Sequence, residues 1–161
     1  MTKTITITTT QDLRERMESR VDKKSGESLS ARWNRDLEAY LYLMDYGTRQ
    51  ARRVLTRNEA QLILDSMNST YRDLRFGGEI WVPSGLEIQI QDSCDMEDLD
   101  KKWSVNKEVL LDKLRSMDTL TRIALIDWVS QAWTNVSDEE GFDNALKGFR
   151  PDPEEAEASE R

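Results

Sequence analysis

The sequence predicts a mainly helical protein with a small β component, in which a short strand precedes a series of amphipathic helices. Three observations favour this fold class. Isoleucine and threonine alternate strictly over residues 4–8, which is typical of a half-buried strand. Apolar residues then recur at spacings of three and four, the period of an α-helix. A second alternating segment, residues 86–90, follows a Pro-Ser-Gly turn sequence and predicts a β-hairpin over residues 79–90.

The opening strand has no partner close to it in the sequence. Ile5 and Ile7 would face a core, whereas the outward positions carry a lysine and three threonines: Lys3, Thr4, Thr6 and Thr8. We expect the strand to pair with the same strand of a second chain, which forms a two-stranded ribbon that fits the major groove of DNA. The alternative is an ordinary edge strand that pairs with the predicted hairpin.

Five helices are predicted from periodicity and capping residues. The first follows the strand and runs to about Lys24, and the second begins at Ser30 as N-cap and ends near Gly47. A Thr56–Glu59 capping box starts the third helix. Two further helices are expected over about residues 105–117 and 120–133. The apolar stripe of the second helix comprises Trp33, Leu37, Tyr40, Leu41 and Met44.

These elements predict a modular chain with a folded region at each side of a short connector. Residues 1–46 form the strand and two helices, and residues 47–55 form a basic connector. An α+β domain with the hairpin and about three helices follows over residues 56–135. Residues 136–161 contain Pro151, Pro153 and a run of acidic residues, which predicts an acidic, disordered tail.

Composition excludes several classes of function. The chain of 161 residues has one cysteine and no histidine, so neither a disulfide framework nor a typical zinc site is expected. No long apolar run is present, and we expect a cytoplasmic protein without a membrane span. The acidic stretch from Asp92 to Asp100 does not fit a calcium-binding loop, because Glu97 and Trp103 occupy the positions of the required glycine and glutamate.

Charge is distributed unevenly along the chain. The net formal charge is −8, yet residues 1–57 carry twelve basic and eight acidic side chains and residues 58–161 carry eleven and twenty-three. A basic first third before an acidic remainder places any phosphate contact near the N-terminus. Arg49, Arg52 and Arg53 are candidate additional phosphate contacts, together with Arg57; the alternative is a solvated connector that pairs with the acidic domain.

The order of strand, capped helix, breaker and capped helix over residues 3–46 resembles the ribbon-helix-helix family of DNA-binding proteins (Arc/Met repressor-like). This resemblance implies an intertwined dimer whose ribbon reads base edges and whose second helix holds a backbone phosphate at its N-terminus. The DNA-reading positions would then be Lys3, Thr4, Thr6 and Thr8, and the phosphate clamp would comprise Ser30, Ala31 and Arg32.

The sequence therefore predicts a homodimeric, sequence-specific regulator of transcription that binds double-stranded DNA, most simply a repressor of its own or a neighbouring promoter. No nucleophile–base pair or phosphate-binding glycine loop stands out, so we expect no enzyme activity, cofactor or metal. Two alternatives remain open: an antitoxin, and an inhibitor from a phage or mobile element whose acidic C-terminal domain binds a protein by mimicking DNA. A ligand pocket formed by tryptophans is disfavoured against a core role for Trp81, Trp103, Trp128 and Trp133.

Overall fold

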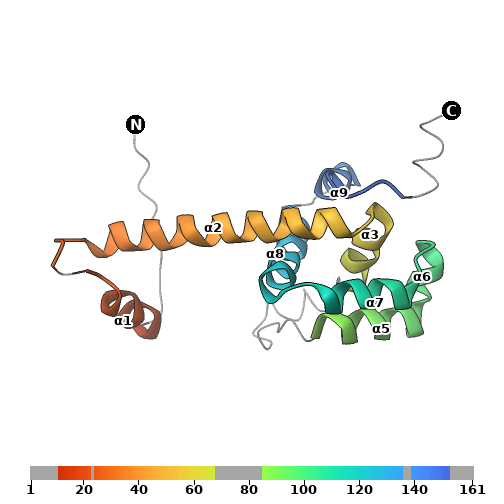
Figure 1. Cartoon of the computed structure of the whole chain (residues 1–161), viewed down its shortest axis with the longest axis horizontal. Coiled ribbons are helices and arrows are strands. Elements are labelled where there is room, and N and C mark those ends of the chain that lie inside the picture. Colours follow the sequence, from red (N-terminus) through yellow and green to blue (C-terminus); the bar gives the residue numbers. More distant parts are fainter. Residues whose placement is uncertain (1–10, 23, 68–84, 136–138, 153–161) are drawn as a thin grey trace. The chain divides into compact units, whose positions relative to one another are not determined.

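The computed structural model describes residues 11–22, 24–67, 85–135 and 139–152, and the chain divides into two units. The first unit comprises Met1–Tyr42 and the second Leu43–Arg161. In both units the described residues form helices joined by short connections (Figure 1). The division falls within one long helix, α2 (Leu29–Val54), to which both units contribute.

The first unit pairs helix α1 (Gln11–Ser19) with the N-terminal part of α2. Between them the chain turns at Gly26, whose φ of +74° is in the left-handed region that favours glycine. Ser28 caps α2, because its hydroxyl accepts the backbone N–H of Ala31 at 3.1 Å. Among the described residues of this unit, Met17 is the one buried hydrophobic side chain, so these residues form no hydrophobic core by themselves.

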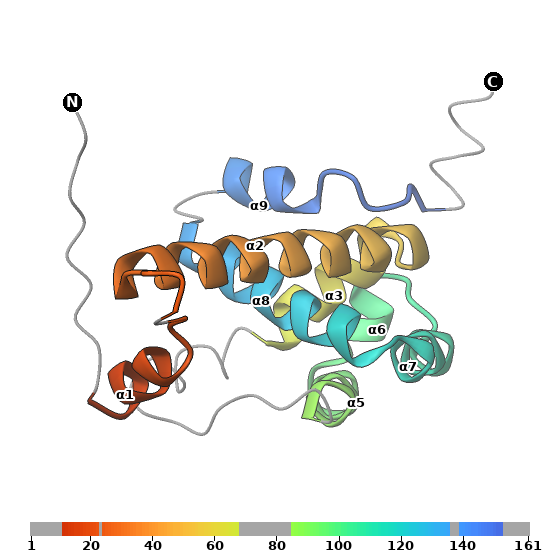
Figure 2. The ribbon, with the colours of Figure 1, turned by 60° about the vertical axis from the view of Figure 1, so that its left-hand side comes forward.

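Helix α2 does not end near Gly47 as predicted, and the predicted connector at residues 47–55 is helical as far as Val54. Gly47 is buried, and a Cβ atom there would lie 2.5 Å from the Cβ of Ala124. Figure 2 shows the C-terminal half of α2 crossing over α8 (Thr119–Asn135). The glycine thus permits a close helix crossing, which a sequence pattern cannot distinguish from a helix C-terminus.

The core of the second unit is built mainly from helices in the residues described, with Leu55, Met67 and Phe149 contributed from outside them. Its other helices are α3 (Arg57–Ser66), α5 (Gly85–Glu97), α6 (Leu99–Lys102), α7 (Lys107–Ser116) and α9 (Glu139–Leu146). Helix α3 packs against α5 and α6, and α5 packs against α7. The largest fully buried side chains are Leu55, Leu62, Ile63, Leu64, Met67, Leu86, Ile90, Leu110, Leu111, Leu114, Leu125 and Val129.

Local capping fixes the starts of these helices. The predicted capping box is confirmed: Thr56 and Glu59 exchange side-chain to backbone hydrogen bonds at the start of α3. The Glu59 carboxylate also accepts the Lys113 ammonium group at 2.7 Å and so joins α3 to α7. Asp118 accepts the backbone N–H of Thr121 at 2.8 Å, and this hydrogen bond holds the pKa of the Asp118 carboxyl below its usual value.

The predicted β-hairpin is wrong where the structure describes it. Residues 86–90, expected to form its second strand, lie in α5. Leu86, Ile90 and Cys94 are buried at helical spacing, whereas Ile88 is 63% exposed. Alternating apolar residues satisfy a period of two and a spacing of four at once. The exposure of Ile88 shows that the spacing of four determines which residues are buried.

The predicted disordered tail is also wrong in part, because residues 139–152 are folded. Leu146 and Phe149 are buried, and the ring of Phe149 lies 4.9 Å from that of Trp128. Arg150 bridges to Thr56, and the Asp152 carboxylate accepts the backbone N–H of Asn58 at 3.1 Å. The prediction of disorder rested on the acidic composition of the whole segment, which does not show that a few of its residues anchor it to the core.

The predicted fold class therefore needs correction. The described residues contain no strand, so neither a β-ribbon nor a hairpin is seen, and this part of the chain is helical rather than helical with a small β component. The predicted ribbon strand, residues 3–8, lies outside the described residues. Of the helices that the structure describes, none has the length and apolar character needed to cross a membrane.

The crossing at Gly47 generates a test of this packing. We expect Gly47→Val to destabilise the protein by about 2–3 kcal/mol, because the side chain has no space beside Ala124. A thermal unfolding scan should show a fall in Tm of roughly 5–10 °C. Gly85→Ala is the control, because a Cβ atom at Gly85 meets nothing within 4 Å. An unchanged Tm for Gly47→Val would contradict the crossing.

Candidate functional site: the surface of helix α2

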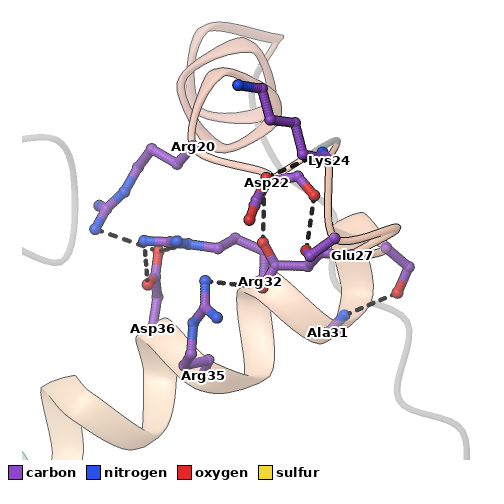
Figure 3. Close-up of polar contacts among 10 residues, drawn as sticks. Arg20, Asp22, Lys24, Glu27, Ala31, Arg32, Arg35 and Asp36 are labelled. Atoms are coloured by element: carbon purple, nitrogen blue, oxygen red, sulfur yellow. Dashed lines mark hydrogen bonds and ion pairs between the residues drawn. The ribbon is translucent and has the colours of Figure 1, made fainter.

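A cluster of charged side chains joins the turn that follows α1 to α2 (Figure 3). Asp36 accepts Arg32 at 3.0 Å and lies 3.5 Å from the guanidinium of Arg20. Beside this group, Arg35 pairs with Glu27 at 2.8 Å. The side chains of Arg32 and Asp36 are about one-fifth exposed, so their pairing is partly protected from solvent. The cluster stabilises the first unit, which has few apolar contacts.

This cluster occupies the residues of the predicted phosphate clamp. Ser28, and not Ser30, is the N-cap of α2, and its hydroxyl already accepts the N–H of Ala31. The backbone N–H of Arg32 donates to the carbonyl of Ser28 at 3.0 Å, and its side chain pairs with Asp36. Ser30 is exposed in the first turn of α2. The backbone N–H groups of Ala31 and Arg32, which were expected to hold a phosphate, thus donate within the chain.

The other predicted DNA-reading positions are not placed. Lys3, Thr4, Thr6 and Thr8 lie outside the described residues, so their contacts stay a prediction. Of the predicted arginines, Arg57 pairs with Asp143 at 2.7 Å, as expected if the basic residues contact acidic residues of the second unit.

An apolar stripe lies exposed on the part of α2 that belongs to the first unit. Leu37 and Leu41 are each 49% exposed, and Tyr40 lies between them on the same face. Leu13 of α1 is exposed as well. From here on, "apolar stripe" denotes only the three exposed residues Leu37, Tyr40 and Leu41 of the larger predicted stripe. The sequence predicted these residues as part of the apolar stripe of the second helix, and in the structure they are exposed.

A second surface lies on the part of α2 that belongs to the second unit. Tyr46, Arg49 and Arg53 follow one another at spacings of three and four, so they share one face of the helix. All three are exposed. Neither Arg49 nor Arg53 forms an ion pair with a carboxylate that the structure describes. We call these three residues the tyrosine–arginine face.

Arg52, the third predicted arginine, does not belong to this face. Its guanidinium lies 5.6 Å from the centre of the Phe149 ring, a cation–π contact with the C-terminal segment. The sequence grouped Arg49, Arg52 and Arg53 because they would lie on one side of a helical connector. Helical phase alone does not separate Arg52 from Arg49, which lies three residues before it. The contact with Phe149 of the folded C-terminal segment makes the distinction.

Trp103, Trp128 and Trp133 serve the core, as the sequence favoured. Trp103 donates its indole N–H to Asp65, Trp128 to the carbonyl of Ala145 and Trp133 to the carbonyl of Leu64. Trp81 lies outside the described residues. No group of three or more potential metal ligands occurs among the residues that the structure describes.

Comparison of the chain with protein-family models, with curated proteins and with solved structures found no match in any of the three. The functional argument therefore depends on the two surfaces of α2 and on the charge distribution of the chain.

The charged cluster predicts a measurable loss when its shared carboxylate is neutralised. We expect Asp36→Asn to weaken the attachment of α1 by at most about 1 kcal/mol, because α2 then loses its ion pair with Arg20, the residue that directly follows α1. Hydrogen exchange of the α1 amides should become up to roughly fivefold faster. Glu38→Gln, at an exposed carboxylate on the same helix, is the control. Equal protection of α1 in Asp36→Asn and the parent would show that the cluster does not hold α1.

Proposed function

We propose that this protein is a homodimeric DNA-binding regulator, in which the first unit holds the two copies together and the tyrosine–arginine face contacts the DNA backbone. The observation that carries the proposal is the division of α2 into two kinds of exposed surface. One is apolar and belongs to the first unit. The other is basic and aromatic and belongs to the second. No β-ribbon is required for either contact.

The dimer is supported by what the first unit lacks. Its described residues bury one hydrophobic side chain, Met17, while Leu13 and the apolar stripe remain exposed. Units of this size rarely fold alone, and oligomerisation is a usual way to bury their apolar surface. Most soluble oligomers are homo-oligomers, and twofold dimers are the commonest. A second copy is therefore the occupant that we propose for the apolar stripe.

Binding to DNA is supported by the chemistry of the tyrosine–arginine face. Arginine without a carboxylate partner can neutralise a phosphate, and phosphate contacts supply most non-specific affinity for DNA. Tyrosine hydroxyls also donate hydrogen bonds to phosphate oxygens. This face lies in the basic first third of the chain, whereas residues 58–161 carry a net charge of −12. The acidic remainder would be repelled by DNA, which favours docking through α2.

The dimer is tested by changing the apolar stripe. Each half-exposed leucine contributes about 1 kcal/mol when a partner covers it. A dimer contains two copies each of Leu37 and Leu41, so the double variant Leu37→Ser, Leu41→Ser makes the free energy of dimerisation less favourable by about 4 kcal/mol. We expect a roughly thousandfold weaker self-association, measured by light scattering after size exclusion and by sedimentation.

The matched control is Ile88→Ser, which makes the same kind of change at an exposed position of α5. Circular dichroism verifies that each variant remains helical. A monomeric parent at about 100 μM, or a double variant that dimerises as tightly as the parent, would refute self-association through the stripe.

Binding to DNA is tested by salt dependence. We expect the parent to bind duplex DNA from upstream of its own gene, with log affinity falling linearly against log salt concentration. Arg49→Gln and Arg53→Gln should each reduce that slope by about 0.9 per subunit, because each removes one phosphate contact. Arg57→Gln, at an arginine already paired with Asp143, should leave the slope unchanged.

The competing function would give a different result in the same assay. Absence of DNA affinity, together with a tight stoichiometric protein partner recovered from the native operon, would favour the antitoxin or the acidic inhibitor. That outcome would be consistent with the −12 net charge of residues 58–161. The expected cytoplasmic location fits either function and stays a prediction.

A further inference from the structure

A pocket of about 250 Å³ lies between the C-terminal half of α2 and helix α8, within the second unit. Because α2 and α8 approach most closely at Gly47 and Ala124, crossing helices leave space beside that point. The residues that line this space come from both helices: Met44, Asp45, Thr48, Arg49, Arg52, Asp127, Trp128 and Gln131. The space is large enough for a small molecule and too small for a peptide.

We infer that this pocket binds a small organic anion, whose carboxylate or phosphate group pairs with Arg49 and Arg52. The inference goes beyond the proposed binding of DNA and does not depend on it. Its basis is that two arginines line one pocket without an ion pair to any carboxylate that the structure describes.

Arg52 is held in position before any ligand arrives. Its guanidinium stacks on Phe149, which in turn packs on Trp128. The backbone of Gly148, whose φ is +89°, also lies against the Arg52 side chain. A Cβ atom added at Gly148 would lie 3.4 Å from the Cδ atom of Arg52. The Arg52 Nε atom is buried and has no hydrogen-bond partner among the described residues. A fixed cation loses little conformational entropy on binding an anion.

The other lining residues define the rest of the ligand. Trp128 and Met44 are buried and provide apolar surface for a ring or short hydrocarbon part. Thr48 offers a hydroxyl group. Two carboxylates also line the pocket: Asp45 is exposed, and Asp127 accepts the Gln131 amide at 2.6 Å. They oppose a ligand of high negative charge and favour one that carries a single anionic group.

The inference is tested on the full-length protein with two probes, benzoate and inorganic phosphate, at fixed chloride concentration. We expect at least one probe to shift the indole N–H signal of Trp128 in NMR spectra, with a Kd of about 1 mM or tighter. Tighter binding of benzoate would assign a carboxylate ligand, and tighter binding of phosphate would assign a phosphorylated one.

Two arginine variants provide the matched comparison. Arg49→Gln should lower the affinity for the probe by at least roughly tenfold. Arg53→Gln should bind the probe with the affinity of the parent, because Arg53 does not line the pocket. Arg53→Gln should still reduce binding of DNA, so the two proposals fail independently. The inference is overturned if neither probe moves the Trp128 signal at about 20 mM. Equal weakening by both variants would overturn it as well.

Discussion

The close approach of α2 to α8 at Gly47 is the constraint on which the second unit and its surfaces depend. With a hydrogen atom in place of a side chain, the backbone of α2 approaches the Cβ of Ala124, and Met44, Ala51 and Leu55 become buried. Once that face of the helix is fixed against the core, the helical period places Arg49 and Arg53 toward solvent. The pocket lies beside this crossing, between α2 and α8.

Helix α2 therefore has different surroundings in its two halves. In the second unit its apolar face is covered, whereas in the first unit Leu37 and Leu41 on the same face remain half exposed. Charged contacts around Asp36 stabilise the first unit locally, but ion pairs of this kind contribute little compared with a buried apolar core. A helix that presents large apolar residues to solvent in one half is typical of a surface completed by association.

Much of the helical structure could be predicted, because periodicity and capping are local properties. The Thr56–Glu59 box and the helices α7 and α8 fall where the sequence placed them. The errors arise where a pattern has two physical meanings. Leu86, Ile88 and Ile90 satisfy strand and helix spacing together, and Gly47 could end a helix or permit a crossing. Tertiary packing decides between these meanings, and a single sequence does not record it. For the same reason the pocket, whose two sides come from helices far apart in sequence, had no sequence signal.

Arg49 is shared by the two surfaces of the second unit for which we propose ligands. It belongs to the tyrosine–arginine face and also lines the pocket, while Arg52 is held by Phe149 on the pocket side and Arg53 lies on the face alone. One guanidinium cannot pair fully with an anion in the pocket and with a phosphate outside it. If both proposals hold, binding at the two surfaces would be negatively coupled, and by linkage each ligand would weaken binding of the other by the same factor. A small anion acting through Arg49 would thus be an effector that releases DNA without any rearrangement of the helices.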